Sequence, residues 1–264
     1  MAILNVTPDS FYSGSRTPDA GAVERRIRDV VAAGASIIDV GGYSSRPGAD
    51  PVSEEEEWRR VELGVGAVRR LAPDMPVSVD TFRSGVAEQA LERFGPPVIN
   101  DISAGELDPR LPAVAARYDV PYVAMHMKGD PQTMQSLTDY RREIVAEVLD
   151  YFETRIARLR ALGMRRERLI LDPGFGFAKT ADQNYELLAG LHRLCALGYP
   201  VLAGVSRKSM IYKTLGSTPD ESLPGTIALG WEALRQGAAI LRVHDVKEAA
   251  DTVKIFDVFE RNRK

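Results

Sequence analysis

The stretch LILDPGFGFAKT, residues 169–180, decides the fold, because it joins a buried strand to a glycine-rich loop. Its apolar start, Leu169–Leu171, is typical of a strand in a parallel sheet. Asp172 ends this run, Pro173–Gly174 breaks it, and two phenylalanines then alternate with glycine. A carboxylate there could accept two parallel N–H donors from a flat, nitrogen-rich ring, while Phe177 covers a face of that ring. Alternatively, Asp172 caps the next helix and the glycines only turn the chain.

The composition of the chain sets the broad class. Its 264 residues are 44% apolar and 27% charged, which suits one large α/β domain or two small ones. The formal net charge of −3 gives no indication of nucleic acid or an anionic membrane as a partner. A single cysteine, Cys195, excludes an intrachain disulfide and a cysteine-rich metal site. We find no apolar run of membrane-spanning length and no signal peptide before the first strand, so we predict a cytoplasmic protein.

Outward from residues 169–180, short apolar runs alternate with amphipathic segments along the whole chain. The apolar runs predict eight strands, at residues 2–6, 36–40, 77–80, 98–101, 120–127, 169–172, 200–205 and 239–243. The amphipathic segments predict helices at residues 19–34, 53–71, 82–94, 109–118, 139–162, 181–197, 207–215, 225–236 and 246–262.

Strict alternation of strands and helices predicts a parallel sheet. Eight such units at this length predict a closed (β/α)₈ TIM barrel: eight parallel strands with outer helices, in a single domain over residues 1–264. The runner-up is an open doubly wound sheet. That fold usually carries a glycine-rich dinucleotide fingerprint after its first strand, and none follows AILNV at residues 2–6.

In such a barrel, the carboxyl ends of the strands line the active site. Polar residues stand at nearly every predicted strand end, although glycine, proline or serine would be enough to make the turns. This pattern favours an enzyme. The strand-end residues are Asn5, Asp39, Asp80, Asn100, Asp101, His126, Asp172, Ser206, Arg207, Lys208, Arg242 and His244.

Eight motifs stand at these strand ends: LNVTPDSF (4–11), DVGGYSSRPGA (39–49), SVDTFR (78–83), INDIS (99–103), MHMKGDPQTMQ (125–135), DPGFGFAKT (172–180), GVSRKS (204–209) and RVHDV (242–246). In this order and across almost the whole chain, they resemble the motifs of the dihydropteroate synthase family. The resemblance implies that a dihydropterin-6-ylmethyl diphosphate and 4-aminobenzoate form 7,8-dihydropteroate and pyrophosphate in folate biosynthesis, by an SN1-like step assisted by Mg²⁺.

The resemblance also implies a pterin pocket. Asp172 and Lys208 bind one edge of the pterin, Asn100 and Asp80 bind the other, and its faces pack on Met125 and Phe177. The chemistry of the residues agrees, because a pterin edge offers adjacent N–H donors and an ionised Asp172 is a matching bidentate acceptor. The predicted catalytic residues are Asp80, Lys208 and Arg46.

The second half of the predicted site binds the diphosphate and the aminobenzoate. By resemblance, Arg242, His244 and Asn5 bind the diphosphate, and Asn5 also contacts Mg²⁺. An arginine suits phosphate through its rigid fork of donors. The residues expected to shape the aminobenzoate pocket are Phe11, Ser45, Arg46, Pro47, Phe177 and Ser209.

The chain departs from the common family pattern at three positions. Ser13 replaces a frequent aspartate, and Tyr43 and Ser45 stand where glutamate and threonine are usual. The hairpin that usually precedes the first strand is absent from the sequence. Outside the predicted substrate pocket, we expect Asp101 to make structural hydrogen bonds and His126 to be a packed strand-end residue.

Two other functions remain possible on the same kind of barrel. A methyltetrahydrofolate-dependent methyltransferase would share Asp80, Asn100 and Asp172, and a non-catalytic pterin-binding relative would need no diphosphate site. We also expect a homodimer through the late helices, since residues 246–262 have more apolar surface than one buried stripe requires. Its apolar residues are Val253, Ile255, Phe256, Val258 and Phe259.

Overall fold

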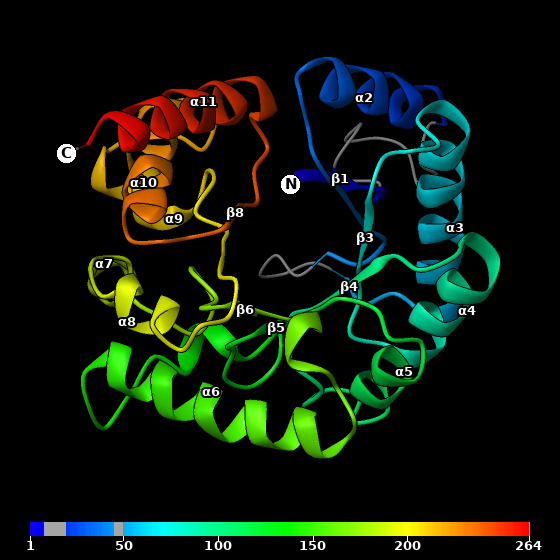
Figure 1. Ribbon diagram of the computed structural model, residues 1–264, viewed down its shortest axis with the longest axis horizontal. Helices are drawn as coiled ribbons and strands as arrows, with labels where there is room; N and C mark the ends of the chain where they lie inside the picture. The colour runs from blue at the N-terminus through cyan, green and yellow to red at the C-terminus, as the bar shows by residue number, and fades with distance from the viewer. Residues whose placement is uncertain (8–19, 45–49, 264) are drawn as a thin grey trace.

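In the described part of the chain, eight short parallel strands form a ring, and the helices pack around its outside (Figure 1). The computed structural model describes residues 1–7, 20–44 and 50–263. The strands are β1 (Ala2–Asn5), β2 (Ile38–Gly41), β3 (Val77–Asp80), β4 (Val98–Asp101), β5 (Tyr122–Met125), β6 (Leu169–Asp172), β7 (Leu202–Ala203) and β8 (Ile240–Leu241).

Strands β1 to β6 form one continuous parallel sheet in chain order, and β7 and β8 form a second pair. Single parallel bridges join the two, from Leu171 to Val201 and from Ala2 to Val243. The ring is therefore closed, and the structure confirms the (β/α)₈ barrel over the open sheet.

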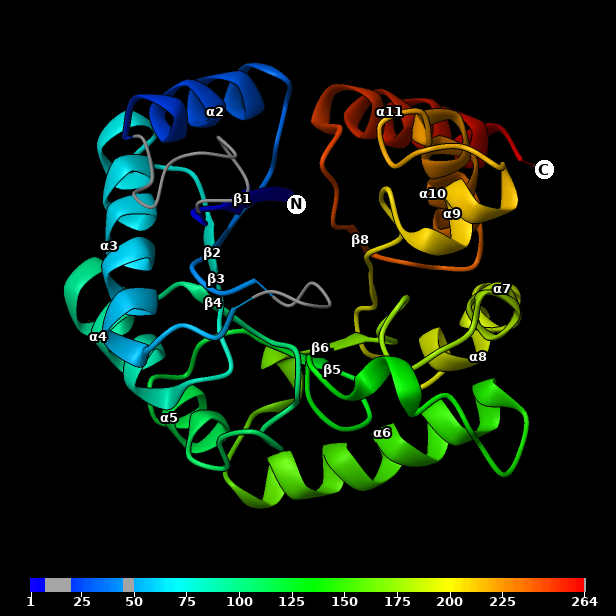
Figure 2. The ribbon, with the colours of Figure 1, turned by 180° about the vertical axis from the view of Figure 1, so that it is seen from behind.

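The helices follow the strands in turn, and Figure 2 shows the same ring from behind. The helices are α2 (Ala20–Ala32), α3 (Glu54–Leu71), α4 (Ser84–Phe94), α5 (Leu111–Arg117), α6 (Ile144–Ala161), α7 (Ala181–Ala189), α8 (Leu191–Cys195), α9 (Ser209–Thr214), α10 (Leu223–Arg235) and α11 (Val246–Asn262), with short 3₁₀ turns η1 (Met134–Ser136) and η2 (Arg166–Arg168). No helix in the described part of the chain combines the length and apolar character needed to cross a membrane.

The main apolar core lies between the outer face of the barrel and the helices. Ile38 and Val40 of β2 belong to it together with Val61 and Val65 of α3. Between them, α3 approaches the barrel closely at Gly64, where a Cβ atom would lie 2.6 Å from Val40 Cγ1. Because side chains alternate along a strand, Asp39 points the other way, into the barrel. The side chains of β2 therefore alternate between the core under the helices and the interior of the barrel.

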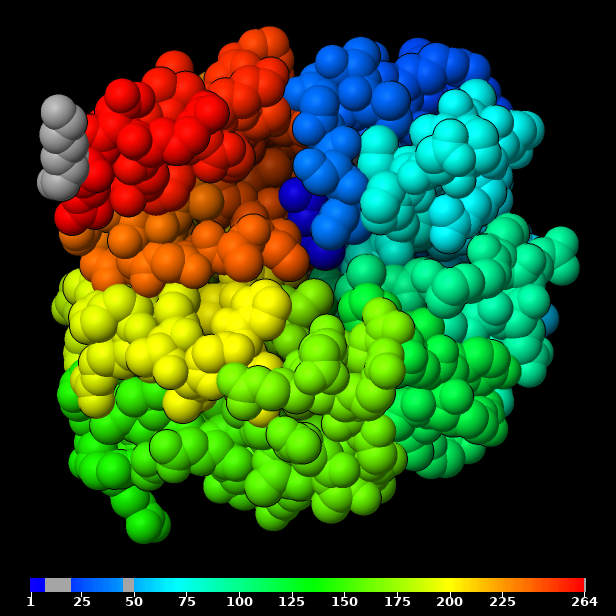
Figure 3. Space-filling view, viewed as in Figure 1, coloured from blue at the N-terminus to red at the C-terminus, as the bar shows by residue number. Residues whose placement is uncertain are grey.

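The last strand of the chain lies next to the first. Helices α2 and α11 are neighbours in the outer ring of helices in both ribbon views. In the space-filling view of Figure 3, the start of the chain, in the darkest blue, is visible near the middle of one face. The terminal amine of Met1 donates to Leu241 O at 2.9 Å, so β1 and β8 meet there.

Some predicted elements are shorter than expected. The helix predicted at 181–197 is split at Gly190, which packs against α6 so closely that a Cβ there would lie 2.7 Å from Val145 Cγ2. The helix predicted at 139–162 begins only at Ile144. The predicted strands 200–205 and 239–243 pair over two residues each, partly because Pro200 has no N–H for a ladder.

Candidate active site at the carboxyl ends of the strands

Three of the predicted strand-end residues lie in one register row with Gly41 of β2. Asn5 pairs with Gly41, Gly41 with Asp80, and Asp80 with Asn100. Their neighbours one residue earlier belong to the core under the helices, so these side chains face the barrel interior. Parallel strands in register therefore bring Asn5, Asp80 and Asn100 to one row at the barrel mouth.

Arg242, directly after β8, forms hydrogen bonds with carboxylates of β2 and β3 beside this row. Its Nη2 donates to Asp80 Oδ2 and its Nε to Asp39 Oδ2, each at 2.7 Å. Asn100 Nδ2 donates to the same Asp39 oxygen at 3.1 Å. Asp39 is fully buried, so the arginine compensates a charge that would be costly alone. Burial by itself would lower the pKa of Arg242, but Asp39 and Asp80 outweigh it and raise that pKa.

Asp80 is the second carboxylate that Arg242 contacts. Burial, with a smaller contribution from the Asp39 charge, raises the pKa of Asp80 to about 7, and Arg242 opposes the rise. Asp80 Oδ2 and Asn5 Oδ1 lie 3.6 and 3.4 Å from the point where a Cβ of Gly41 would stand. Because Gly41 has no side chain, these two oxygen atoms, both of which could bind a metal ion, border the same space. Hard oxygen ligands of this kind fit Mg²⁺, which uses one or two protein ligands and takes the rest from phosphates and water.

Asp172 and Lys208 form the second charged pair of the mouth. Burial raises the pKa of Asp172, and the positive charge of Lys208 opposes that rise. Burial lowers the pKa of Lys208 to about 8, and the negative charge of Asp172 opposes that fall. Asp172 Oδ1 accepts from Gly174 N at 2.8 Å. The helix-capping alternative for Asp172 is wrong, because Thr180 caps α7 in a capping box with Gln183.

An apolar cluster lies beside Asp172. Met125 is its register neighbour on β5, and the ring of Phe177 packs at the margin of the same cluster. Lys208 Nζ lies 4.7 Å from the centre of that ring and donates to Phe175 O. The structure places the six residues predicted for the pterin at the barrel mouth in two groups: Asp80 and Asn100 are register neighbours, and Met125, Asp172, Phe177 and Lys208 lie around the apolar cluster.

His244 follows β8 and is held by Ser206. The backbone N–H of His244 donates to Ser206 Oγ at 3.1 Å, and Oγ lies 3.0 Å from His244 Nδ1. A serine hydroxyl can donate to Nδ1 or accept from it, so these two contacts fix the orientation of the ring beside the end of β8. An imidazole that carries a ring N–H can donate to an anion.

Several predicted residues lie outside the described part of the chain: Phe11, Ser13, Ser45, Arg46 and Pro47. Of the aminobenzoate residues, the structure describes Phe177 and Ser209. Ser209 is the first residue of α9, directly after Lys208. Tyr43 packs edge-on against Phe82 with ring centres 5.1 Å apart.

Two expectations outside the pocket are confirmed. Asp101 is a structural acceptor that bonds Ser103 N, Gly105 N and the Tyr122 hydroxyl, the last at 2.5 Å. His126 is buried and packs edge-on against Tyr151, with ring centres 4.7 Å apart.

Sequence reasoning missed two parts of the site. Asp39 had no assigned role, yet it anchors Arg242 from a position 203 residues away. Lys179 was quoted in the loop but not used, and it is only 5% exposed. A lysine two residues after alternating glycine and aromatic residues was the available signal, but its burial depends on the path of the whole loop.

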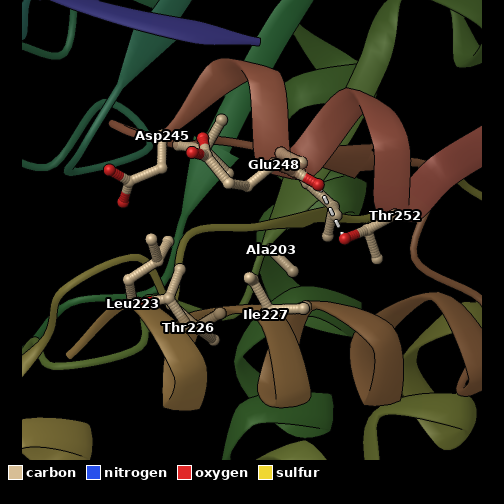
Figure 4. A pocket seen from close by; sticks show the side chains of 12 residues that line it. Ala203, Leu223, Thr226, Ile227, Asp245, Glu248 and Thr252 are labelled. Atoms are coloured by element: carbon tan, nitrogen blue, oxygen red, sulfur yellow. Dashed lines mark hydrogen bonds between the residues drawn. The ribbon is translucent and has the colours of Figure 1, made fainter.

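A small cavity outside the barrel is not part of this site. It lies between α10 and α11, with Ile227 and Ala203 in its wall and Asp245 and Glu248 at its rim (Figure 4). Its volume of about 20 Å³ has room for roughly one water molecule. Its lining is mainly apolar, whereas the polar groups that could bind substrates converge at the barrel mouth.

Comparisons with known proteins agree with this site. A family model described as "Pterin binding enzyme" matches residues 1–244. The dihydropteroate synthase of Synechocystis is 44% identical, covering 99% of this chain and 90% of that protein. That of Escherichia coli is 42% identical, covering 97% of this chain and 90% of that protein.

Solved structures give the same result. A Clostridium difficile dihydropteroate synthase, determined in the presence of pteroic acid, has a TM-score of 0.90 at 38% identity, covering 99% of this chain and 96% of that one. The Yersinia pestis enzyme with a sulfonamide drug has a TM-score of 0.92 at 37% identity, covering 99% and 93%. The fold and site thus define a pterin-binding enzyme.

Within that class, the chain belongs to the dihydropteroate synthase family. It is a transferase of folate biosynthesis, and the comparisons favour this function over the methyltransferase and the non-catalytic relative.

Proposed function

We propose that the barrel mouth joins 7,8-dihydropterin-6-ylmethyl diphosphate to 4-aminobenzoate, with the pterin on Asp172, Lys208, Asn100 and Asp80. One observation carries the residue assignment: the carboxylates Asp80 and Asp172 and the amide Asn100 stand at the carboxyl ends of β3, β6 and β4, whereas Arg242 and His244 follow β8. Solved relatives support the substrate classes. A Xanthomonas albilineans enzyme holds 4-aminobenzoate, another structure from that organism holds 7,8-dihydropteroate, and an Anaplasma phagocytophilum enzyme holds 6-hydroxymethylpterin-monophosphate.

The reaction we propose begins with cleavage of the C–O bond to the diphosphate. The bonding electrons leave with pyrophosphate, and the carbon becomes a cation delocalised into the electron-rich dihydropterin. The amine of 4-aminobenzoate then attacks this carbon and loses a proton to solvent. Asp80 and Asp172 face the charge that develops on the ring, and Arg242 and His244 face the leaving group. Preorganised groups of this kind stabilise a transition state without reorganising.

The aminobenzoate side rests on fewer described residues. We assign Phe177 and Ser209 to it, together with Phe11, Ser45, Arg46 and Pro47, and we assign a catalytic role to Arg46 as well as to Asp80 and Lys208. Mg²⁺ would be held by Asn5 with Asp80 nearby, and when bound it would offset charge on the diphosphate.

The experiment that tests the function is pyrophosphate release. The purified protein is mixed with the dihydropterin diphosphate and Mg²⁺, with and without 4-aminobenzoate, and both pyrophosphate and dihydropteroate are measured. We expect equal amounts of the two products, dependent on the amine. A protein that binds the pterin and forms no dihydropteroate would contradict the proposed reaction and favour a non-catalytic relative.

We further propose a homodimer through α11. Ile255, Val258 and Phe259 are 64%, 50% and 53% exposed, whereas Phe256 is half-buried against Trp231 of α10 at a ring separation of 5.2 Å. Light scattering at micromolar concentration should give twice the chain mass of 29.0 kDa. The substitution Phe259→Asp should give a monomer, and Leu162→Asp, at another exposed apolar position, should not. A wild-type monomer would rule out this interface.

A further inference from the structure

The loop after β6 has an unusual backbone. Gly174, Gly176 and Ala178 have φ values of +70°, +78° and +51°, so three alternate residues are left-handed. A Cβ at Gly174 would lie 2.0 Å from His126 O, which shows how closely the loop lies on the end of β5. An alanine rarely adopts this conformation. The loop that presents Phe177 and Asp172 therefore needs other groups to hold it.

Lys179 supplies the central contacts. Its ammonium group donates to Gly174 O and to Phe177 O, each at 3.0 Å, and lies 2.9 Å from His126 Nδ1. The side chain is only 5% exposed, and lysine is rarely buried to this extent. An ammonium group has three hydrogens, so each of the three acceptors can be satisfied.

The same loop residues connect Lys179 to the pterin site. Gly174 uses its carbonyl for Lys179 and its N–H for Asp172 Oδ1. Phe177 uses its carbonyl for Lys179, and its ring lies at the margin of the apolar cluster that contains Met125. Lys179 itself lies behind the loop, because its donors are all directed at these carbonyls and at His126.

We propose that Lys179 is a positioning residue for the pterin: by holding residues 174–177 against β5, it fixes the Asp172 carboxylate and the Phe177 ring. This inference rests on the proposed function, because it assigns a role within the same pterin pocket. It adds a residue that touches no substrate and acts through the loop.

The charge state of Lys179 follows from its surroundings. Burial and, to a smaller extent, the Lys208 cation lower the pKa of Lys179 to about 7, and Asp172 opposes this shift. Burial and Lys179 hold the pKa of His126 well below its usual value, so its ring is neutral and Nδ1 can accept. The other groups that face His126 are Lys128, Tyr140 and Tyr151.

Deprotonation of Lys179 would weaken the loop contacts. A neutral amine has two hydrogens for three acceptors, and its lone pair would face the lone pair of His126 Nδ1. Pterin affinity should therefore fall as the pH rises through about 7. Lys208 has a pKa of about 8, so its own effect should begin one pH unit higher.

The test compares Lys179→Met with Lys128→Met. Lys128 also lies near His126, over the ring of Tyr140 at 4.5 Å, but donates to Asp139 O and not to the glycine loop. Each variant loses one positive charge. Calorimetry would measure two probes separately: 6-hydroxymethyl-7,8-dihydropterin, and pyrophosphate with Mg²⁺.

We expect Lys179→Met to weaken the dihydropterin about tenfold or more and to leave pyrophosphate affinity within about twofold. Lys128→Met should leave both unchanged. Wild-type dihydropterin binding by Lys179→Met would overturn the proposal, as would an equal loss of both probes. If wild-type protein binds no dihydropterin, the proposed function fails first, and this outcome is distinct from either result.

If Lys179→Met does not fold, the wild-type protein provides the test. Its dihydropterin affinity is measured between pH 6 and 8.5, with ¹⁵N-labelled histidine observed by NMR. We expect affinity to fall through about pH 7 and the His126 ring nitrogens to respond at the same pH, with Nε2 protonated below it. Because Asp80 titrates over the same range, the affinity is measured on Asp80→Asn as well, and an affinity of that variant that stays constant until about pH 8 would contradict the proposal.

Discussion

The two sheets of the barrel contribute opposite chemistry to its mouth. The six-stranded sheet supplies Asn5, Asp39, Asp80, Asn100 and Asp172, which are acidic or amide side chains. The β7–β8 pair, with the residues that directly follow it, supplies Lys208, Arg242 and His244.

This difference matters because the two sets meet across a single network. Arg242 of the cationic side bonds both Asp39 and Asp80 of the acidic side. A substrate that separates charge as it reacts suits such a mouth, since the ring becomes positive on one side and the diphosphate leaves on the other. The short β7–β8 pair therefore has a role that its two-residue strands would not suggest.

The largest effect should come from removing the charge of Asp172. Asp172→Asn places amide hydrogens where the pterin directs its own donors, so pterin binding itself should fail. Calorimetry with a pterin measures this directly, and Asp182→Asn, at an exposed position of α7, is a matched control. Normal pterin binding by Asp172→Asn would refute the assignment of this carboxylate, while pyrophosphate binding should be retained.

Arg242→Ala tests the cationic side. It should weaken the diphosphate substrate by a few kcal/mol, if the contact is charge-assisted and desolvated, and 4-aminobenzoate far less. It also leaves Asp39 buried without its partner, so the free energy of unfolding should fall by about 3 kcal/mol.

The control for Arg242→Ala is Arg168→Ala, which removes a more exposed ion pair with Asp119 and should cost less than about 1 kcal/mol. Substrate affinities and denaturant unfolding are measured on the same preparations. Equal losses for the two substrates in a folded Arg242→Ala protein would count against the diphosphate assignment.

The pH dependence should show a smaller effect on the acidic side. Burial raises the pKa of Asp80 to about 7, so below that pH the side chain is protonated in the free enzyme and its negative charge is lost. We expect kcat/KM to fall about tenfold per pH unit below 7. The acid limb should be absent from the profile of Asp80→Asn, and an unchanged limb in that variant would assign the titration to another group.

Much of the fold could be predicted from local patterns. Strands β3, β4 and β6 have the predicted bounds, because buried parallel strands are short apolar runs ended by polar residues. The bounds of β7 and β8 could not be predicted equally well. Each of these strands pairs over only two residues, and this length is set by how the barrel closes and not by the local sequence.

The sequence predicts which residues stand at the strand ends, but not the contacts that these residues make with one another. The register of parallel strands places Asn5, Asp80 and Asn100 together, and the sequence indicates each of them. The Arg242–Asp39 contact and the burial of Lys179 join segments through tertiary packing, so no local pattern reports them. Residues at 45–49 and 8–19 lie outside the described part, and their predicted roles stay predictions.

The most direct test of the charge separation is Asp80→Asn, because Asp172 also binds the ground state. The substitution keeps the size of the side chain and removes its charge. Single-turnover chemistry is measured beside pterin affinity on the same protein.

We expect kcat to fall by roughly 10²-fold or more, the scale for losing one electrostatic contact in the transition state, with a smaller change in pterin affinity. An Asp80→Asn enzyme that binds the pterin poorly yet turns over normally at saturation would show that Asp80 only holds the substrate, and it would contradict the account.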